Sequence, residues 1–318
     1  MLGPALGILE IVLPVFLIVG AGYGCVRAGL FANPQIDALL RFATQFAIPC
    51  LLFTAMVNLD LGATFDPVFL LSYYVSATAA FALTGLTAWK VFGRRPGESV
   101  AIGFCALFAN SILLGLPIFE RAYGPGAMGP SFAIIAMHAP FCYGLGITIM
   151  EVARADGRSA ADTARAALKA MFRNALSIGL ALGLAVNLTG FPLPAALEEA
   201  TGLLGRAGLP IALFGLGGVL TRYALASGLR ESGVIIFASL VLHPALAWAL
   251  THHVFALPPE FVRAAVVTAA MPPGVNAFLF ASMYDRAVDV AAATVLLATL
   301  CAVLSASLWL AALQAAFP

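Results

Sequence analysis

Long hydrophobic stretches, separated by short turns rich in glycine, proline or charged residues, recur along the whole chain. A helix that crosses the hydrocarbon core of a bilayer needs about 20 mostly apolar residues. Cutting the sequence at its charge and turn signals predicts ten such helices. They span residues 5–26, 36–57, 68–90, 98–120, 127–151, 171–190, 196–220, 230–250, 261–284 and 288–314. The pattern therefore predicts an all-α integral membrane protein with ten transmembrane helices.

Two of these helices, the fourth and the ninth, are interrupted near their middle. The first interruption lies at Asn110 and Ser111, with Gly115 and Pro117 close behind, and the second covers residues 272–276. In hydrocarbon, an unwound backbone persists only where protein or a water-filled cavity satisfies its polar groups. A matched pair of interrupted helices in the two halves of a chain indicates the substrate site of a secondary transporter.

Landmarks in the two halves recur at a nearly constant spacing. Pro49 and Pro210, inside the second and seventh predicted helices, are 161 residues apart (210 − 49). Glu98 and Glu260, which open the two interrupted segments, are 162 apart (260 − 98). Each half holds five predicted helices, an odd number, so the second half enters the membrane with the opposite orientation. This spacing predicts two inverted five-helix repeats.

Lysine and arginine are distributed unevenly between the connections. With the amino terminus outside, thirteen of the sixteen basic residues fall on the cytoplasmic side. Positive charge is enriched on that side of membrane proteins, so we predict a multi-pass protein of the cell (inner) membrane with both termini outside the cytoplasm. The two repeats are predicted at 1–152 and 171–318, and a basic cytoplasmic linker at 153–170.

The composition agrees with a membrane protein and excludes several other classes. The chain has 318 residues, of which 62% are hydrophobic and 10% charged, whereas soluble domains average about 25% charged residues. Its five cysteines lie in apolar runs and form no CxxC pair, which predicts neither a disulfide framework nor a metal site. Catalytic signatures and basic-aromatic stretches are missing from the sequence, so we expect no enzyme, no cofactor and no nucleic-acid partner.

Blocks around the interruptions and around the two prolines resemble the auxin efflux carrier family. They are residues 49–53 (PCLLF), 110–117 (NSILLGLP), 210–217 (PIALFGLG) and 271–278 (MPPGVNAF). That family includes plant auxin exporters and bacterial permeases for malonate, malate and similar organic acids. The resemblance implies the fold of the related bile acid:sodium symporters. In that fold a scaffold bundle accompanies a crossover panel, which holds the two broken helices crossing near the bilayer midplane. It also implies a homodimer.

The interruptions offer chemistry suited to an anion. Half-helix N-termini carry free N–H groups and a partial positive charge of about half a unit, which a carboxylate matches. Amide and hydroxyl side chains donate hydrogen bonds, prolines keep the helix from re-forming, and glycines allow close approach. The alternative is that these residues only kink packed helices. The candidate substrate-binding residues here are Asn110, Ser111, Gly115, Pro117, Pro272, Pro273, Gly274 and Asn276.

Two further polar residues lie in apolar helices. Gln45 is predicted either to line the substrate cavity or to tie two helices together. Arg206 is predicted to contact an anionic substrate on its outer route, to extend toward the interface, or to pair with Glu198 or Glu199.

Ionisable residues within the predicted helices are candidates for proton coupling. His138, His243 and Glu10 are the candidates in this chain. Histidine titrates near neutral pH, yet a single histidine on an apolar helix is also a common packing residue. The coupling ion is H⁺ or Na⁺, the latter held by unwound carbonyl groups, and the sequence does not choose between them.

Together these observations predict a secondary transporter of a small organic anion that works by alternating access. The anion is a mono- or dicarboxylate of the malonate, malate or auxin kind, by resemblance. An uncoupled facilitator or a channel-like exporter is the alternative mechanism. An intramembrane enzyme or a non-transporting sensor is the alternative class. The expected partners are the anion, the lipid bilayer and a second copy of the chain.

Overall fold

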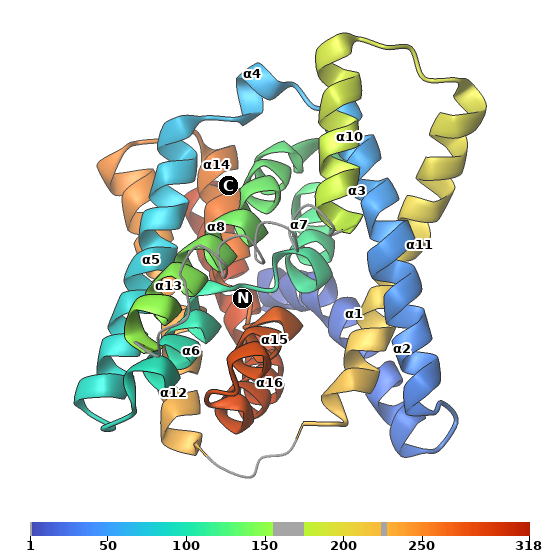
Figure 1. Cartoon of the computed structure of the whole chain (residues 1–318). Helices are drawn as coiled ribbons and strands as arrows, with labels where there is room; N and C mark the ends of the chain where they lie inside the picture. The colour runs from blue at the N-terminus through green and yellow to red at the C-terminus, as the bar shows by residue number, and fades with distance from the viewer. Residues whose placement is uncertain (1, 155–174, 224–227) are drawn as a thin grey trace. The chain divides into compact units, whose positions relative to one another are not determined.

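The computed structural model describes residues 2–154, 175–223 and 228–318, and these residues are almost entirely helical (Figure 1). Side chains are described from Gly7 to Ala153 and throughout the two later ranges. Most of the predicted linker, from residue 155 on, lies outside the described residues. Seven described helices are long and apolar enough to cross a membrane: Gly7–Arg27, Asn33–Val57, Pro67–Lys90, Gly129–Ala153, Ala195–Leu220, Leu229–Val254 and Val288–Ala316. Three shorter apolar helices are Pro96–Leu107, Ala175–Thr189 and Val275–Tyr284. The chain is an all-α, multi-pass membrane protein.

The chain divides into two compact units, and each takes segments from both predicted repeats. The larger unit comprises Met1–Leu13, Phe65–Ala167 and Tyr223–Pro318, and the smaller unit comprises Pro14–Thr64 and Leu168–Arg222. Both interrupted segments belong to the larger unit. The units are described separately below.

The smaller unit is built around helix α3. Its helix α3 contacts both α10 and α11. The elements that contribute to it are α1 (Leu2–Arg27, from Pro14 on), α2 (Asn33–Phe42), η1 (Ala43–Ala47), α3 (Ile48–Val57), α4 (Leu61–Thr64), α10 (Ala175–Thr189) and α11 (Ala195–Leu220).

Glycines let α10 approach the backbone of α3 closely. A Cβ added at Gly179 would lie 2.5 Å from the carbonyl oxygen of Pro49, and one added at Gly183 would lie 2.5 Å from that of Phe53. No larger residue fits at such distances without a shift of the backbone. This spacing of small residues, four positions apart on one helix, is typical of close helix pairs in membranes.

Asn187 of α10 caps the end of α3. Its Nδ2 lies 3.0 Å from the carbonyl oxygen of Met56, 2.9 Å from that of Val57 and 2.8 Å from that of Leu59. The last carbonyls of a helix have no partners within the helix, and here one amide side chain donates to carbonyls at that end.

The second and seventh predicted helices are not interrupted at their prolines. Pro49 is the second residue of α3 and follows the π-helical turn η1, in which the Ile48 N–H donates to the carbonyl of Ala43. Pro210 lies inside the continuous helix α11. In membranes, local π-helical turns re-satisfy backbone groups that a proline frees, which explains why α2, η1 and α3 remain one helical rod.

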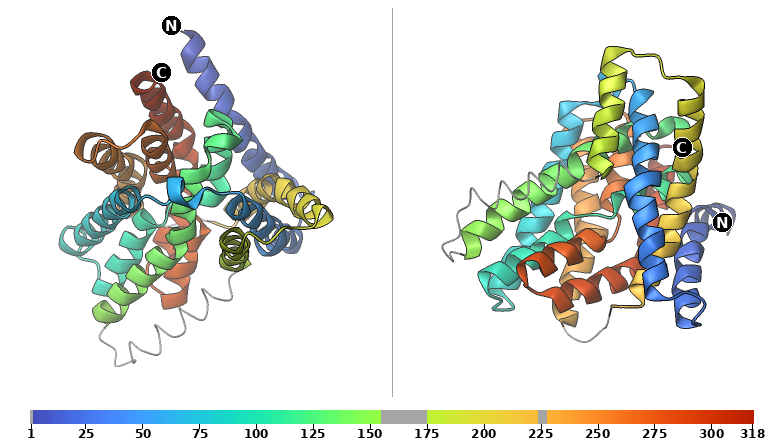
Figure 2. Two further views of the ribbon diagram at one scale, coloured as in Figure 1. Left: turned by 90° about the horizontal axis from the view of Figure 1, so that it is seen from above. Right: turned by 45° about the vertical axis from the view of Figure 1, so that its right-hand side comes forward.

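The larger unit surrounds the two interrupted segments with four long helical rods. Helix α6 packs on α5 and α8, α12 and α15 pack on α16, and α13 packs on α5 and α14 (Figure 2). Besides the N-terminal part of α1, the elements are α5 (Pro67–Lys90), α6 (Pro96–Leu107), η2 (Ser111–Gly115), α7 (Leu116–Tyr123), η3 (Pro125–Ala127), α8 (Gly129–Arg154), α12 (Leu229–Phe237), η4 (Ala238–Leu242), α13 (His243–Trp248), η5 (Ala249–Val254), α14 (Pro259–Ala269), α15 (Val275–Tyr284) and α16 (Val288–Ala316).

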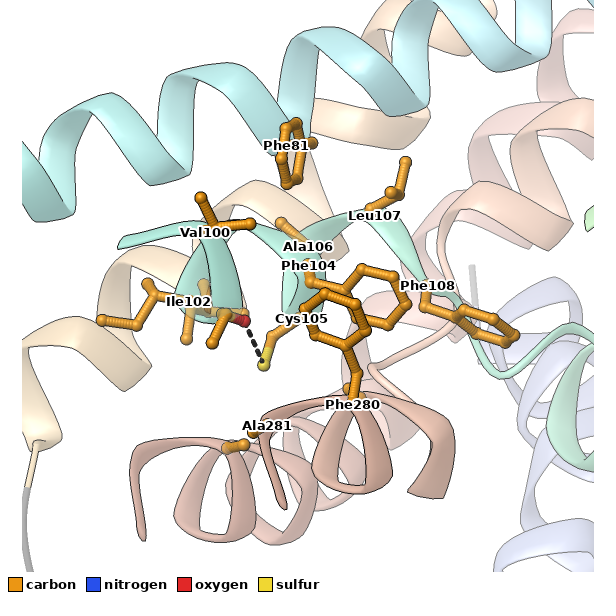
Figure 3. Packing of buried hydrophobic residues seen from close by; sticks show 14 of the residues in the cluster. Phe81, Val100, Ile102, Phe104, Cys105, Ala106, Leu107, Phe108, Phe280 and Ala281 are labelled. Carbon is orange, nitrogen blue, oxygen red and sulfur yellow. Dashed lines mark hydrogen bonds between the residues drawn. The ribbon is translucent and has the colours of Figure 1, made fainter. Parts of the chain in front are cut away.

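Aromatic rings fill the core of the larger unit between α6 and α15 (Figure 3). The rings of Phe104 and Phe280 stack with centroids 3.8 Å apart and an interplanar angle of 9°. Gly146 of α8 makes room for this stack, because a Cβ there would lie 2.5 Å from the Phe104 ring. The stack fixes the register of one interrupted segment against the other.

An ion pair joins the loop before α6 to the start of α12. The Arg94 Nη2 lies 2.7 Å from the Glu231 Oε1, and the Glu231 residue is only 8% exposed. The hydrogen bond to Glu231 raises the pKa of Arg94 above its ordinary value, so this guanidinium stays charged at any pH at which the protein works.

We expect Asn187→Asp to destabilise the protein, because a carboxylate has no hydrogen to donate and adds negative charge beside three carbonyl oxygens. Losing such bonds costs about 1–3 kcal/mol, measured as a lower midpoint of thermal unfolding in detergent. Asn58→Asp is the matched control, since the Asn58 Nδ2 donates to a single carbonyl, that of Thr54, at an exposed position. Equal midpoints for the two variants would contradict the capping role.

Candidate functional site

Both predicted interruptions are present, each shifted toward the N-terminus from the position read off the sequence. Helix α6 ends at Leu107, residues 108–110 are non-helical, and the chain resumes as η2 at Ser111. Helix α14 ends at Ala269, residues 270–274 are non-helical, and α15 begins at Val275. Ser111 and Asn276, expected within the unwound stretches, are therefore already in helical turns.

The two breaks pair with one another as a single antiparallel bridge between Ala109 and Pro273. The Asn110 N–H donates to the carbonyl of Pro272 at 2.8 Å, and the Gly274 N–H donates to the carbonyl of Phe108 at 3.4 Å. These bonds flank the bridge, so the paired residues themselves exchange none. A proline, which has no N–H, therefore fits at 273 without leaving a donor unmet.

The four half-helices pack crosswise around this bridge. Helix α6, before the first break, contacts α15, which follows the second. Helix α14, before the second break, contacts η2 and α7, which follow the first. The N-terminal ends of η2 and α15 both begin at the bridge, so their partial positive charges meet there. Pro117 is buried as the second residue of α7, directly after the π-helical turn η2.

Each interrupted segment places a glycine against the break of the other: Gly115 at the end of η2, and Gly274 in the second break. A Cβ at Gly115 would lie 3.4 Å from the Cγ of Met271, and a Cβ at Gly274 would lie 3.3 Å from the Cγ of Asn110. The Asn110 side chain thus lies against Gly274, the residue that precedes α15.

Asn110 offers an unused donor at the bridge. Its residue is 7% exposed and that of Ser111 is 4% exposed. The Asn110 carbonyl accepts from the N–H groups of Leu114 and Gly115 at 3.3 and 3.0 Å. Its Nδ2, in contrast, is buried and has no hydrogen-bond partner among the described residues.

Asn276 belongs to the same neighbourhood through an aromatic residue of α8. The hydroxyl of Tyr143 donates to the Asn276 Oδ1 at 3.3 Å. The Tyr143 ring packs edge-on against Phe108, with centroids 5.4 Å apart, and Phe108 lies in the first break. Tyr143 thus links Asn276 to the first break. It was not among the predicted site residues, because an aromatic residue in an apolar helix gives no distinctive signal.

The structure brings the two candidate histidines together. Both contact the ring of Tyr73 on α5, with centroid distances of 6.0 Å for His138 and 5.3 Å for His243. His138 Nε2 also donates to the carbonyl of Ala109 at 3.2 Å, so this side chain is attached to the first break. Tyr73 escaped the sequence reasoning for the same reason as Tyr143.

Glu10 does not join the histidines. It lies on an exposed face of α1, and within the described chain no contact links it to either of them. Its backbone carbonyl accepts a hydrogen bond from Arg121 Nη2 at 2.9 Å, which anchors the start of α1 to α7.

Gln45 and Arg206 lie in the smaller unit. Gln45 is exposed in η1 and lines a mostly apolar groove of about 1040 Å³ formed with α3, α10 and α11. No hydrogen bond from its amide to another described residue ties two helices together. Arg206 is exposed on α11 and forms no ion pair with a described residue, Glu198 and Glu199 included.

The described residues form a multi-pass helical membrane protein in which two interrupted segments pair at their breaks. The sequence matches the family model described as membrane transport protein over residues 7–310, and the chain belongs to this family, which includes the auxin efflux carriers. The expected family resemblance is thereby confirmed.

Named relatives align over nearly their whole length. One from Rhizobium meliloti (strain 1021), named "Putative malonate transporter", is 26% identical over 92% of both chains. The "Uncharacterized transporter YfdV" of Escherichia coli (strain K12) is 24% identical over 94% of this chain and 95% of its own. A rice protein (Oryza sativa subsp. japonica) named "Probable auxin efflux carrier component 5a" is 23% identical over 89% and 90%. These names are those of transporters, which points away from an enzyme.

We expect Gly274→Ala to destabilise the protein more than Gly115→Ala. The new methyl group at 274 meets the Cβ and Cα of Asn110 at 3.4 and 3.5 Å besides its Cγ, whereas at 115 its nearest neighbour is the flexible Met271 side chain. Overpacking of this kind costs about 1 kcal/mol or more. Thermal unfolding in detergent measures both variants, and a larger loss for Gly115→Ala would argue against the described contact.

Proposed function

We propose that this chain is a secondary transporter of a small organic anion, a mono- or dicarboxylate such as malonate, malate or an auxin. The family match and the transporter names of the relatives support carriage of a solute. The observation that carries the choice of an anion is the buried Asn110 Nδ2, a donor without a partner at a point where two helix N-termini meet.

The bridge region suits a carboxylate for electrostatic reasons. Helix N-termini attract anions through their free N–H groups and their partial positive charge, and the Asn110 amide adds a directed donor. A lysine or arginine would bind the anion more tightly but would be left as an unpaired charge in lipid after release. Neutral donors allow the site to be emptied as well as filled.

The transport mechanism that we propose is alternating access. The larger unit holds the crossing and acts as the panel, and the smaller unit acts as the scaffold against which it moves. The ten helices form two inverted repeats, residues 1–152 and 171–318, joined by the linker at 153–170, with both termini outside the inner membrane. A homodimer in which scaffolds provide the fixed contact fits this mechanism. Gln45 and Arg206 of the scaffold then lie along the anion's route.

An uncoupled facilitator is the second candidate mechanism. It uses the same site and differs only in the energy source.

We expect Asn110→Asp to reduce uptake of the transported acid by roughly 10- to 100-fold, because a hydrogen bond to a charged group contributes about 1.5–3 kcal/mol and the new carboxylate repels the anion. Asn276→Ala is expected to reduce uptake as well. Uptake of radiolabelled malonate, malate and indole acetate into proteoliposomes is the measurement.

The matched control for these variants is Asn58→Asp, which makes the same change at an exposed residue of the smaller unit. Thermal unfolding shows whether each variant is folded. Rates like those of the unmodified protein in folded Asn110→Asp and Asn276→Ala would refute the site.

The proposed orientation predicts which loops a membrane-impermeant thiol reagent reaches in intact cells. In a background without the five native cysteines, Gly126→Cys, between α7 and α8, should be labelled from outside. Val91→Cys, at the end of α5, should be labelled only after the cells are opened. A Cβ at Gly126 meets nothing within 4 Å and Val91 is 71% exposed, so access depends on topology alone. The reverse pattern would overturn the orientation.

A further inference from the structure

Tyr73, His138 and His243 form a buried group of ionisable side chains beside the bridge, here named the histidine cluster. Its members come from α5, α8 and α13. Tyr73 and His243 are 0% exposed and His138 is 2% exposed. The Tyr73 ring contacts both imidazole rings, so the three side chains are one cluster rather than separate packing residues.

Three polar atoms of this cluster have no hydrogen-bond partner among the described residues. They are the hydroxyl of Tyr73 and the Nδ1 and Nε2 of His243. An unpaired buried polar atom costs about 1–3 kcal/mol, and buried polar groups in folded proteins are normally paired. Phenylalanine and leucine would fill the same space without this cost, which indicates that the polar atoms serve a purpose other than packing.

The cluster is coupled directly to the bridge. His138 Nε2 donates to the carbonyl of Ala109 at 3.2 Å, and Ala109 is the residue paired with Pro273 and adjacent to Asn110. A positive charge on His138 is therefore placed one hydrogen bond away from the backbone of the proposed anion site.

Among the residues that the structure describes, none in contact with the cluster carries a permanent negative charge. The ionisable groups that contact it are Tyr74 and Cys142, which are neutral. The charged residues and the other histidines on the surrounding elements lie near the helix ends: Lys90 on α5, Glu98 on α6, Glu151 and Arg154 on α8, Glu260 and Arg263 on α14, and His252 and His253 on η5. Cys105 on α6 and Tyr143 on α8 lie within their helices and carry no permanent charge. An imidazolium without a counter-charge is unfavourable in such an interior.

We propose that the histidine cluster binds a proton together with the organic anion, so that the carrier is a proton–anion symporter. This inference rests on the proposed function, because the anion at the bridge provides the negative charge that balances the imidazolium. Opposite charges stabilise one another at short range. The coupling is reciprocal: the anion favours proton binding by the same factor as the proton favours anion binding.

The test uses full-length protein in proteoliposomes at zero membrane potential, with radiolabelled malonate, malate and indole acetate tried in turn and a pH-sensitive dye inside. A gradient of one pH unit, acid outside, supports about tenfold accumulation of the acid for each coupled proton. We expect such accumulation, and acidification of the lumen, for the unmodified protein.

His138→Gln retains an amide donor for the Ala109 carbonyl but cannot take up a proton. In this variant and in His243→Asn, we expect the internal concentration of the acid to rise no higher than the external concentration. Exchange of the anion across the membrane should continue. Tyr74→Phe is the matched control, because the Tyr74 hydroxyl is already bonded to the carbonyl of Ile134 at 2.7 Å and its loss should leave accumulation unchanged. Tyr73→Phe removes the unpaired hydroxyl at the neighbouring position and should weaken accumulation.

A second measurement needs no variant. The chain has four histidines, so ¹⁵N NMR of histidine-labelled protein resolves each ring, with His252 and His253 as references. Adding the transported acid should convert a ring of the cluster to imidazolium, and unchanged rings would overturn the inference.

The remaining outcomes separate the two proposals. Anion flux without proton flux, or full pH-driven accumulation in both histidine variants, overturns the symport and leaves the carrier intact. No flux of any of the three acids overturns the proposed function and the symport with it.

Discussion

Two backbone hydrogen bonds between the breaks are the constraint on which the larger unit depends. An interrupted helix in a membrane exposes N–H and C=O groups that lipid cannot satisfy. Here each break supplies hydrogen-bond partners to the other. The Asn110 N–H donates to the Pro272 carbonyl, and the Gly274 N–H donates to the Phe108 carbonyl. Each interruption therefore depends on the other for a backbone hydrogen-bond partner.

Crosswise packing then places the N-terminal ends of two helical segments, η2 and α15, beside the bridge. The Phe104–Phe280 stack holds α6 against α15, and Gly115 and Gly274 let the two breaks touch. With the half-helices fixed in this way, the N-termini of η2 and α15 have no freedom to separate. A polar site in the interior of the unit thus follows from apolar packing on both sides of it, and no buried cation is needed to create it.

The sequence predicted the all-α membrane class, the long apolar helices and both interruptions, because the signals for them are local. Asparagine, proline and glycine together mark a break in an apolar run, and the offset between halves relates one break to the other. Proline alone was a weaker guide: Pro49 and Pro210 lie in continuous helices, the former behind a π-helical turn that hydropathy does not reveal. The grouping of His138, His243 and Tyr73 required tertiary structure, since these residues come from three separate helices and share no sequence pattern.

The cap formed by Asn187 has a consequence for covalent modification. Asn187-Leu188-Thr189 matches the acceptor pattern for N-linked glycans, and the atom that would carry the sugar is the Nδ2. That nitrogen is engaged by three carbonyl oxygens at the end of α3. Expression of the chain in a eukaryotic secretory pathway should therefore yield protein without oligosaccharide at this tripeptide, despite its consensus.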